Sequence, residues 1–233
     1  MFPVRNNTKL KEKIVWVIVA LLLYLMGWFY DYNNGWFYDY NNEKAKAPAA
    51  ETTAEADKIS DQVIDKRDGK TYKTVKIGSQ VWMAENLAYK PSSGNYWAYD
   101  GDNSNVAKYG YLYDWETAKK ICPSGWHLPS DEEWATLTDY LGGANVAGTK
   151  MKSTSGWEYG GNGTNESGFS GLPGGYRSSN GNYYSIGDFG TWWSSTQSIT
   201  YNAWDRNLYF NTSAVGRSYY YKGSGLSVRC LRD

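Results

Sequence analysis

An apolar run at residues 14–30, IVWVIVALLLYLMGWFY, constrains this chain more than any other feature, because it is just long enough to cross a bilayer as a helix. Basic residues precede the run and acidic residues follow it, namely Arg5, Lys9, Lys11 and Lys13 against Asp31, Asp39 and Glu43. Positive charge marks the cytoplasmic end of such a span. The run therefore predicts a single-pass membrane protein of the cell envelope, with a cytoplasmic N-terminus and an extracytoplasmic domain.

A cleaved signal peptide is the alternative interpretation of this run. Such a peptide has a shorter apolar core and a small-residue cleavage site close behind it. Here the nearest site of that kind, Ala45-Lys46-Ala47, lies far beyond the run. We therefore favour an uncleaved anchor, with cleavage left open. The predicted divisions are a cytoplasmic basic flank at 1–13, a transmembrane anchor at 14–30, an aromatic repeat and spacer at 31–57, and a globular domain at 58–233.

The octapeptide GWFYDYNN occurs twice in tandem, at residues 27–34 and 35–42. Two copies are too few for a repeat architecture, so an accident of replication is favoured over an interfacial aromatic belt. Beyond it, residues 43–57 are mostly Ala, Glu, Lys and Thr and predict a solvated spacer.

Charge and composition limit the function of the globular part. The chain has 24 Lys and Arg against 24 Asp and Glu, so no net field draws it to nucleic acid. Its 12 Trp, 22 Tyr and 25 Gly favour short strands and aromatic-rich loops over helices. We therefore expect no nucleic-acid partner and helix as the minor component.

Three local patterns predict particular elements. The alternation in TVKI, the turn GS and the extended QVWMA predict a hairpin near residues 74–84. In DWETAKKIC, Asp114 is a helix N-cap and Glu116 precedes Lys120 by four residues, which predicts a short helix that ends near Cys122. A second helix begins at Ser130, where SDEE is a capping box, and ends at Gly142.

The stretch ICPSGWHLPSDEEW gathers Cys122, the single histidine His127 and three acids, so it invites an interpretation as a catalytic or metal site. Each residue also has a structural use. The acids belong to the capping box and the first helical turn. In an extracytoplasmic domain Cys122 would pair with Cys230, the only other cysteine. A lone histidine beside Trp126 is more often a packed ring than a ligand. The stretch therefore predicts structure and no enzyme.

No cofactor is predicted either. The segment DGDNSN at residues 100–105 places oxygens at alternate positions, as the start of a calcium loop does. It lacks glycine at the sixth position, and Tyr111 stands at the twelfth in place of a bidentate glutamate. Calcium stays open, but the motif favours a solvated turn.

Six segments in order resemble the motifs of the Fibrobacter succinogenes major paralogous domain, from about Asp65 to Asp233: DGKTYKTVKIGSQVWMAENLAY, YGYLYDWETA, CPSGWHLPSDEEW, GFSGLPGGYR, WWSSTQS and GLSVRCLRD. The part around the two helices also resembles C-type-lectin-like domains and, through them, the formylglycine-generating enzymes. This resemblance implies an α+β fold with two short helices, a small twisted antiparallel sheet and long irregular loops, here preceded by the transmembrane helix. It independently implies the Cys122–Cys230 disulfide.

The resemblance does not carry over the activities of those proteins. The nearest string to the calcium-binding Trp-Asn-Asp strand of lectins is AWDRN, which lacks the Asn-Asp pair. The close cysteine pair of formylglycine-generating enzymes is absent from the sequence. The resemblance therefore implies a fold and leaves the ligand open.

The most favoured function is a tethered recognition or adhesion module that binds a polysaccharide, a cell-wall component or a surface protein. In residues 201–210 we place Trp204, Leu208 and Phe210 on the inner face and Asp205, Asn207 and Tyr209 on the outer face. Tyrosine and asparagine suit recognition, because they combine contact area with adaptable hydrogen bonding. The predicted ligand-binding residues are Tyr201, Asn202, Asp205, Asn207, Tyr219 and Tyr220. An assembly subunit of a surface structure and, less favoured, an enzyme are the alternatives; oligomeric state and genetic diversification of these loops stay open.

Overall fold

The computed structural model describes residues 28–31, 36–39 and 60–233, and the chain divides into two units, Met1–Thr53 and Ala54–Asp233. In the first unit the tandem octapeptide forms two strands, β1 (Trp28–Asp31) and β2 (Trp36–Asp39). They pair antiparallel, with Trp28 opposite Asp39 and Asp31 opposite Trp36. The two copies of the repeat thus supply the two halves of one hairpin.

This hairpin corrects the predicted membrane anchor, because Trp28–Asp31 form a strand where the last residues of a helix over 14–30 were expected. The rest of that predicted span lies outside the described residues. Within the described ranges, no helix combines the length and the apolar character that crossing a bilayer requires. The sequence-based predictions of a single-pass topology and of a cell-envelope localisation were therefore wrong and are not retained.

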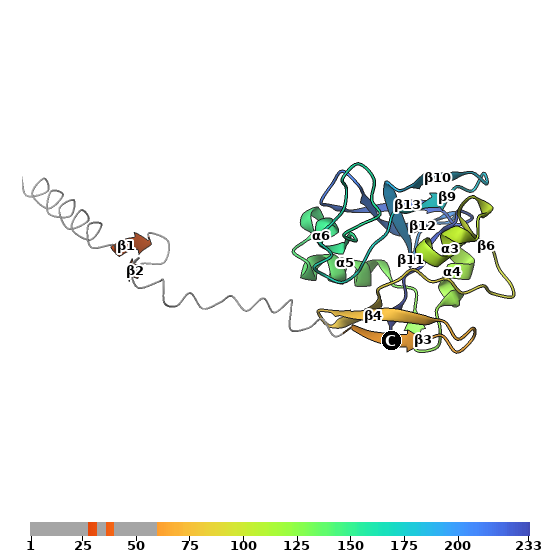
Figure 1. Ribbon diagram of the computed structural model, residues 1–233, viewed down its shortest axis with the longest axis horizontal. Helices are drawn as coiled ribbons and strands as arrows, with labels where there is room; N and C mark the ends of the chain where they lie inside the picture. Colours follow the sequence, from red (N-terminus) through yellow and green to blue (C-terminus); the bar gives the residue numbers. More distant parts are fainter. Residues whose placement is uncertain (1–27, 32–35, 40–59) are drawn as a thin grey trace, which may run out of the picture. The chain divides into compact units, whose positions relative to one another are not determined.

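In the second unit, the described residues 60–233 form thirteen strands in two sheets, four α-helices and one 3-10 helix. Figure 1 shows how these elements are arranged. The strands of the smaller sheet are β3 (Ser60–Ile64), β4 (Thr71–Ile77), β5 (Gln80–Met83), β8 (Trp126–His127) and β15 (Leu231–Arg232). The larger sheet contains β6 (Tyr96–Trp97), β7 (Leu112–Tyr113), β9 (Gly174–Arg177), β10 (Tyr183–Ile186), β11 (Phe189–Ile199), β12 (Asn202–Tyr209), β13 (Val215–Tyr221) and β14 (Leu226–Ser227). The helices are η1 (Tyr99–Gly101), α3 (Ser104–Tyr109), α4 (Trp115–Ile121), α5 (Asp131–Tyr140) and α6 (Ala144–Met151).

The smaller sheet is antiparallel throughout, in the order β3-β4-β5-β15-β8. Its β4–β5 pair is the hairpin that the sequence predicts. The last strand of the chain, β15, lies between β5 and β8, so the C-terminal residues join these two strands into one sheet.

The larger sheet is mixed. Its long strand β11 pairs antiparallel with β12, and parallel with β9 and β14. This mixed eight-stranded sheet and the four α-helices of the described residues correct the predicted fold class of two helices with a small antiparallel sheet. The domain is mostly β, and the C-type-lectin-like α+β assignment was wrong.

Both predicted helix starts are confirmed. The Asp114 side chain accepts a hydrogen bond from the Thr117 N–H (2.8 Å) at the start of α4. At α5, Ser130 Oγ accepts from the Glu133 N–H (3.2 Å), and the Glu133 carboxylate accepts from the Ser130 N–H (2.7 Å). This reciprocal pair satisfies two backbone donors that no helical carbonyl reaches.

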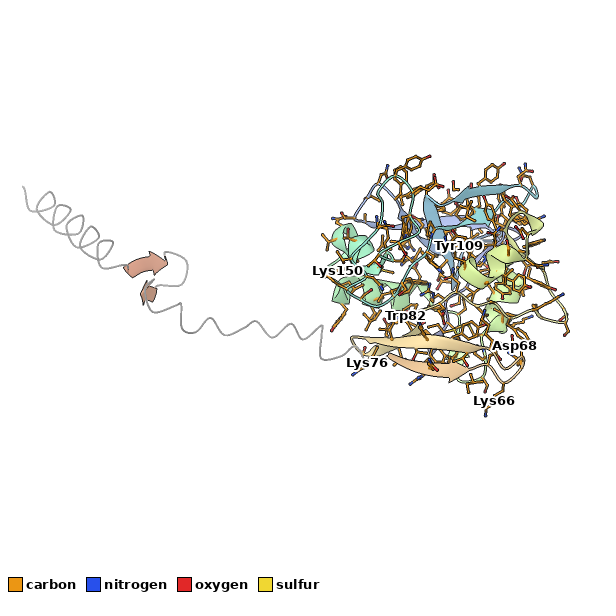
Figure 2. All side chains as sticks on the ribbon, viewed as in Figure 1. Lys66, Asp68, Lys76, Trp82, Tyr109 and Lys150 are labelled. Atoms are coloured by element: carbon orange, nitrogen blue, oxygen red, sulfur yellow. A yellow bond between two sulfur atoms is a disulfide. The ribbon has the colours of Figure 1, made fainter. Side chains whose placement is uncertain are left out.

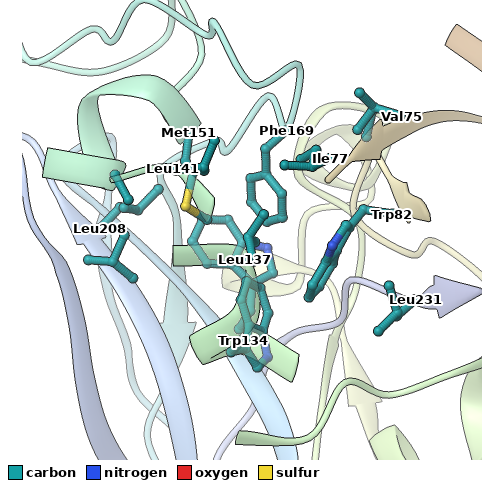
Figure 3. Close-up of a cluster of buried hydrophobic side chains, with 14 of the residues drawn as sticks. Val75, Ile77, Trp82, Trp134, Leu137, Leu141, Met151, Phe169, Leu208 and Leu231 are labelled. Carbon is teal, nitrogen blue, oxygen red and sulfur yellow. The ribbon is translucent and has the colours of Figure 1, made fainter. Parts of the chain in front are cut away.

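Two hydrophobic cores lie on opposite faces of the large sheet. Strand alternation sends Trp192 into the core under α5 and α6, and its neighbour Trp193 into the core beside α4. Figure 3 shows the first core, in which Trp82 and Trp134 meet with ring centroids 4.7 Å apart. Trp82, on β5, is fully buried where the smaller sheet meets the rest of the domain (Figure 2). Because both faces of β11 and β12 are covered, few side chains of these strands reach solvent.

The predicted disulfide is confirmed in the second core. Cys122 follows α4 and bonds to Cys230, which is fully buried just before β15. The disulfide therefore links the C-terminal end of α4 to the residue that precedes β15 of the smaller sheet.

Candidate ligand-binding face

The predicted ligand-binding residues divide into an exposed group and a buried group. Tyr201 is 72% exposed and Tyr219 is 55% exposed, so both are free to meet a ligand. Tyr220 is only partly exposed and packs against the second core. The other three residues, Asn202, Asp205 and Asn207, are buried. The structure thus brings two of the predicted tyrosines to the surface and places the polar residues of β12 inside.

The outward assignment of Asp205 and Asn207 was therefore wrong. Asp205 Oδ2 accepts hydrogen bonds from Thr191 Oγ1 and Asn207 Nδ2, both at 2.9 Å, beneath the central strands. Burial raises the pKa of Asp205, against the hydrogen bonds from Asn207 and Thr191 that favour the carboxylate. These residues form a polar cluster inside the domain, because this side of β12 is covered.

On the opposite side of the β12–β13 pair, the residues of β13 become more exposed toward the C-terminal end of that strand. Register sets Leu208 opposite Val215, Arg206 opposite Arg217, Trp204 opposite Tyr219 and Asn202 opposite Tyr221. Paired residues share a face of the sheet. Leu208 and Val215 lie in the core, whereas Tyr219 and Tyr221 lie in solvent.

The two arginines anchor this side to helix α5. Arg206 donates to the Asp131 carboxylate and to its backbone carbonyl (Nη2, 3.0 Å), and Arg217 Nε donates to both carboxylate oxygens at 3.0 Å. Burial on its own would raise the pKa of Asp131, but the hydrogen bonds from Arg217 and Arg206 hold that pKa below its ordinary value. Asp131 therefore stays ionised and keeps both guanidinium groups in place.

An aromatic row continues from these arginines. The Arg217 guanidinium lies 3.4 Å from the centroid of the Trp204 ring, and the Tyr219 ring meets Trp204 edge to face at 5.9 Å. Tyr221, 62% exposed, follows two residues after Tyr219 on the same side. We name Tyr201, Trp204, Arg217, Tyr219 and Tyr221 the aromatic face. Trp204 was predicted to be internal, and only the pairing register with Tyr219 reveals its place.

A shallow hollow of about 330 Å³ adjoins this face at the strand ends. Tyr201 and Tyr221 line it together with Thr200, Lys222 and Ser179. The Lys222 N–H donates to the Tyr201 carbonyl (2.9 Å), which fixes the two turns against each other. The backbone at Tyr201 is thus hydrogen-bonded to the residue that follows Tyr221.

The stretch around His127 is held by structural contacts. The His127 ring lies between two carboxylates, with Nδ1 2.6 Å from Asp233 Oδ1 and Nε2 2.9 Å from Glu133 Oε1. Burial alone would lower its pKa, but hydrogen bonds with Asp233 and Glu133 raise that pKa above its ordinary value. The imidazole joins β8 to the capping box of α5 and to Asp233.

The sequence model of the Fibrobacter succinogenes major domain matches residues 75–232, which is more than half of the chain. The match covers all of the large sheet, the four α-helices and the disulfide just described. This protein therefore belongs to the Fibrobacter succinogenes major domain family. No curated protein and no solved structure matches the chain.

Proposed function

We propose that this domain is a non-catalytic recognition module that binds a polysaccharide through the aromatic face. The observation that carries the proposal is the exposure of Tyr201, Tyr219 and Tyr221 around the Trp204–Arg217 stack. Isolated exposed aromatics are ordinary in proteins, but a row of them on one strand pair is a patch that a partner would cover.

Sugar rings suit such a row. The faces of aromatic rings carry negative charge, and the C–H groups on one side of a pyranose ring are polarised positive by the neighbouring oxygens, so the two surfaces attract. Arg217 adds guanidinium donors for hydroxyl groups at the edge of the row. Because β12 and β13 are paired along seven positions, the backbone that carries the rings of Trp204, Tyr219 and Tyr221 is already ordered before binding.

The chemistry of the surrounding groups supports binding over catalysis. Cys122 and Cys230 are joined, His127 is held by two carboxylates, and Asp131 is held by two arginines. Each of these groups already has a structural partner, so none is poised as a nucleophile or a general base in this conformation.

The test is binding of the full chain to an array of soluble and insoluble polysaccharides, followed by affinity measurement on the best binder. We expect the double variant Tyr219→Ala/Tyr221→Ala to weaken binding at least tenfold, since two aromatic contacts are worth about 1 kcal/mol each. The matched control is Tyr159→Ala/Tyr184→Ala, which removes two exposed tyrosines elsewhere and should bind as the parent does.

Two results would sink the proposal. One is an equal loss of affinity in both double variants, which would show that the loss does not depend on the aromatic face. The other is a turnover activity that His127→Ala abolishes and Tyr219→Ala/Tyr221→Ala leaves intact, because that would return the site to the stretch around His127.

A further inference from the structure

A second cleft in the described part of the domain shares no lining residue with the aromatic face or with the hollow beside it and has no role in the proposed site. It has a volume of about 470 Å³, within the range of small-molecule sites. Three segments line it, the β3–β4 turn at Arg67, the loop 89–95 and the outer side of α4 at Glu116 and Lys120.

Its floor is rigid. Asp114 Oδ2 accepts from Asn95 Nδ2 (2.7 Å), and Thr117 Oγ1 accepts from the Asn95 N–H (2.9 Å). Gly94 has φ +94°, and a Cβ there would meet Thr117 Oγ1 at 2.3 Å, so only glycine lets the loop lie this close to α4. The loop and the helix are thus locked together while the cleft between them stays open.

One wall combines an aromatic ring with a fixed cation. Arg67 stacks 3.8 Å from the centroid of the Tyr89 ring, and its guanidinium donates to both oxygens of buried Asp65 (2.8 and 2.6 Å). This bidentate pair orients the planar group. The wall therefore places a fixed guanidinium and the aromatic ring that it stacks on side by side.

The polar groups of the floor have capacity left for a ligand. Asn95 Nδ2 makes one hydrogen bond to Asp114, so its second N–H and the amide oxygen are available in the described structure. Ser92 and Ser93 add exposed hydroxyls at the rim. The lining of the cleft thus includes both donors and acceptors, as a ligand with many hydroxyl groups requires.

The charges that line the cleft balance. Arg67 and Lys120 are positive, whereas Asp114 and Glu116 are negative. A strongly charged ligand of either sign would be attracted by one of these two pairs of side chains and repelled by the other. From this balance, the aromatic wall and the unfilled hydrogen-bonding groups, we infer that the cleft between loop 89–95 and α4 is a second binding site, specific for a neutral sugar residue.

This inference rests on the proposed function for the class of ligand, but it concerns different residues and is tested separately. The probes are neutral hexasaccharides of glucose, xylose, mannose and galactose, titrated by calorimetry into the full chain. We expect two sites per chain for the hexasaccharide that binds. Ser93→Trp, which fills the cleft from an exposed position, should reduce the stoichiometry from two to one, and Tyr219→Ala/Tyr221→Ala should remove the other site.

Lys120→Trp fills the cleft from the helix side and should act as Ser93→Trp does, which guards against a folding defect in either variant. Ser155→Trp, another exposed serine outside the cleft, should keep two sites. A stoichiometry of one that Tyr219→Ala/Tyr221→Ala abolishes and both tryptophan variants preserve would overturn the inference and leave the proposed function standing. Binding lost only in the two cleft variants would support the inference and refute the proposed function, and no binding of any probe would overturn both.

Discussion

The disulfide offers the sharpest test of how this domain is stabilised. Cys122 and Cys230 are separated by 108 residues in sequence and by 5.9 Å between their Cα atoms. Cys230 is fully buried, and its carbonyl accepts from the Met83 N–H (3.0 Å) in the smaller sheet. Replacing both cysteines by alanine removes the cross-link and leaves these backbone contacts in place.

The expected effect follows from the length of the closed loop. In the chain-entropy treatment, a cross-link over a loop of this length removes about 4.8 kcal/mol of entropy from the unfolded chain at 25 °C. Most domains have only about 5–15 kcal/mol of unfolding free energy, so the variant should lose a large part of it. With a urea m-value of about 2 kcal/mol per M, the midpoint should fall by about 2 M.

The assay is urea unfolding followed by tryptophan fluorescence, which the buried Trp82, Trp134, Trp192 and Trp193 make sensitive to core opening. The m-value of the variant should also rise, because an unfolded chain without the cross-link exposes more surface. Unfolding of the parent protein in a reducing agent is the control, since it opens the same loop without changing a side chain. A loss below about 1 kcal/mol in both experiments would refute the loop-entropy reasoning.

Three further substitutions test local contacts by the same unfolding assay. Ser130→Ala removes the acceptor for the Glu133 N–H and should cost about 1 kcal/mol; no loss would mean that α5 does not depend on this cap. Gly148→Ala should destabilise despite a gain of about 1 kcal/mol in helix propensity, because its Cβ would meet the Ala214 carbonyl oxygen at 2.5 Å; a more stable variant would contradict that contact. The raised pKa of His127 contributes stability that is complete below pH 6.5 and is lost as pH rises through the folded-state pKa. His127→Gln should remove that part of the pH dependence of the unfolding free energy. Equal pH dependence in the parent and the variant would contradict this role of His127.

Elements that depend on a few neighbouring residues could be predicted from the sequence. The Asp114 cap, the Ser130–Glu133 capping box and the β4–β5 hairpin each arise from hydrogen bonds within a short segment. The disulfide joins cysteines 108 residues apart and is not local, but it could also be predicted, because two cysteines allow a single pairing and the family resemblance implied it.

The mixed sheet could not be predicted in this way. β11 pairs in parallel with β9 and β14 through single residue pairs, Gly190 with Gly175 and Trp192 with Ser227. Such pairing depends on segments that approach only after folding, and no local pattern encodes it. The resemblance to lectin-like domains filled this gap with the wrong sheet and too few helices.

The prediction of exposed residues from the alternation of side chains along β12 failed for a related reason. A polar residue on a strand indicates the solvent face only when one face is covered. At Asp205 and Asn207 both faces of β12 are covered, so these polar residues are buried and hydrogen-bonded to each other. Arg229, between β14 and β15, is likewise fully buried and donates to Asn86 Oδ1 (2.7 Å) and to the carbonyls of Met83 and Phe169. Burial lowers the pKa of Arg229 to about 9. The prediction therefore placed Asp205 and Asn207 on the wrong side of β12.

The same covering explains why the aromatic face begins where it does. Along β12 and β13, the Leu208–Val215 pair lies in the core under α5 and α6, and the Arg206–Arg217 pair meets Asp131 in the first turn of α5. Beyond that turn the helix no longer covers the strands, so the next pair, Trp204 with Tyr219, meets solvent. Asp131 thus lies in the first turn of α5, where the helix dipole favours an acid, and it pairs with both arginines at the boundary. The acidic run in the sequence is structural, as predicted, and through this contact it also sets the edge from which the exposed aromatic row extends.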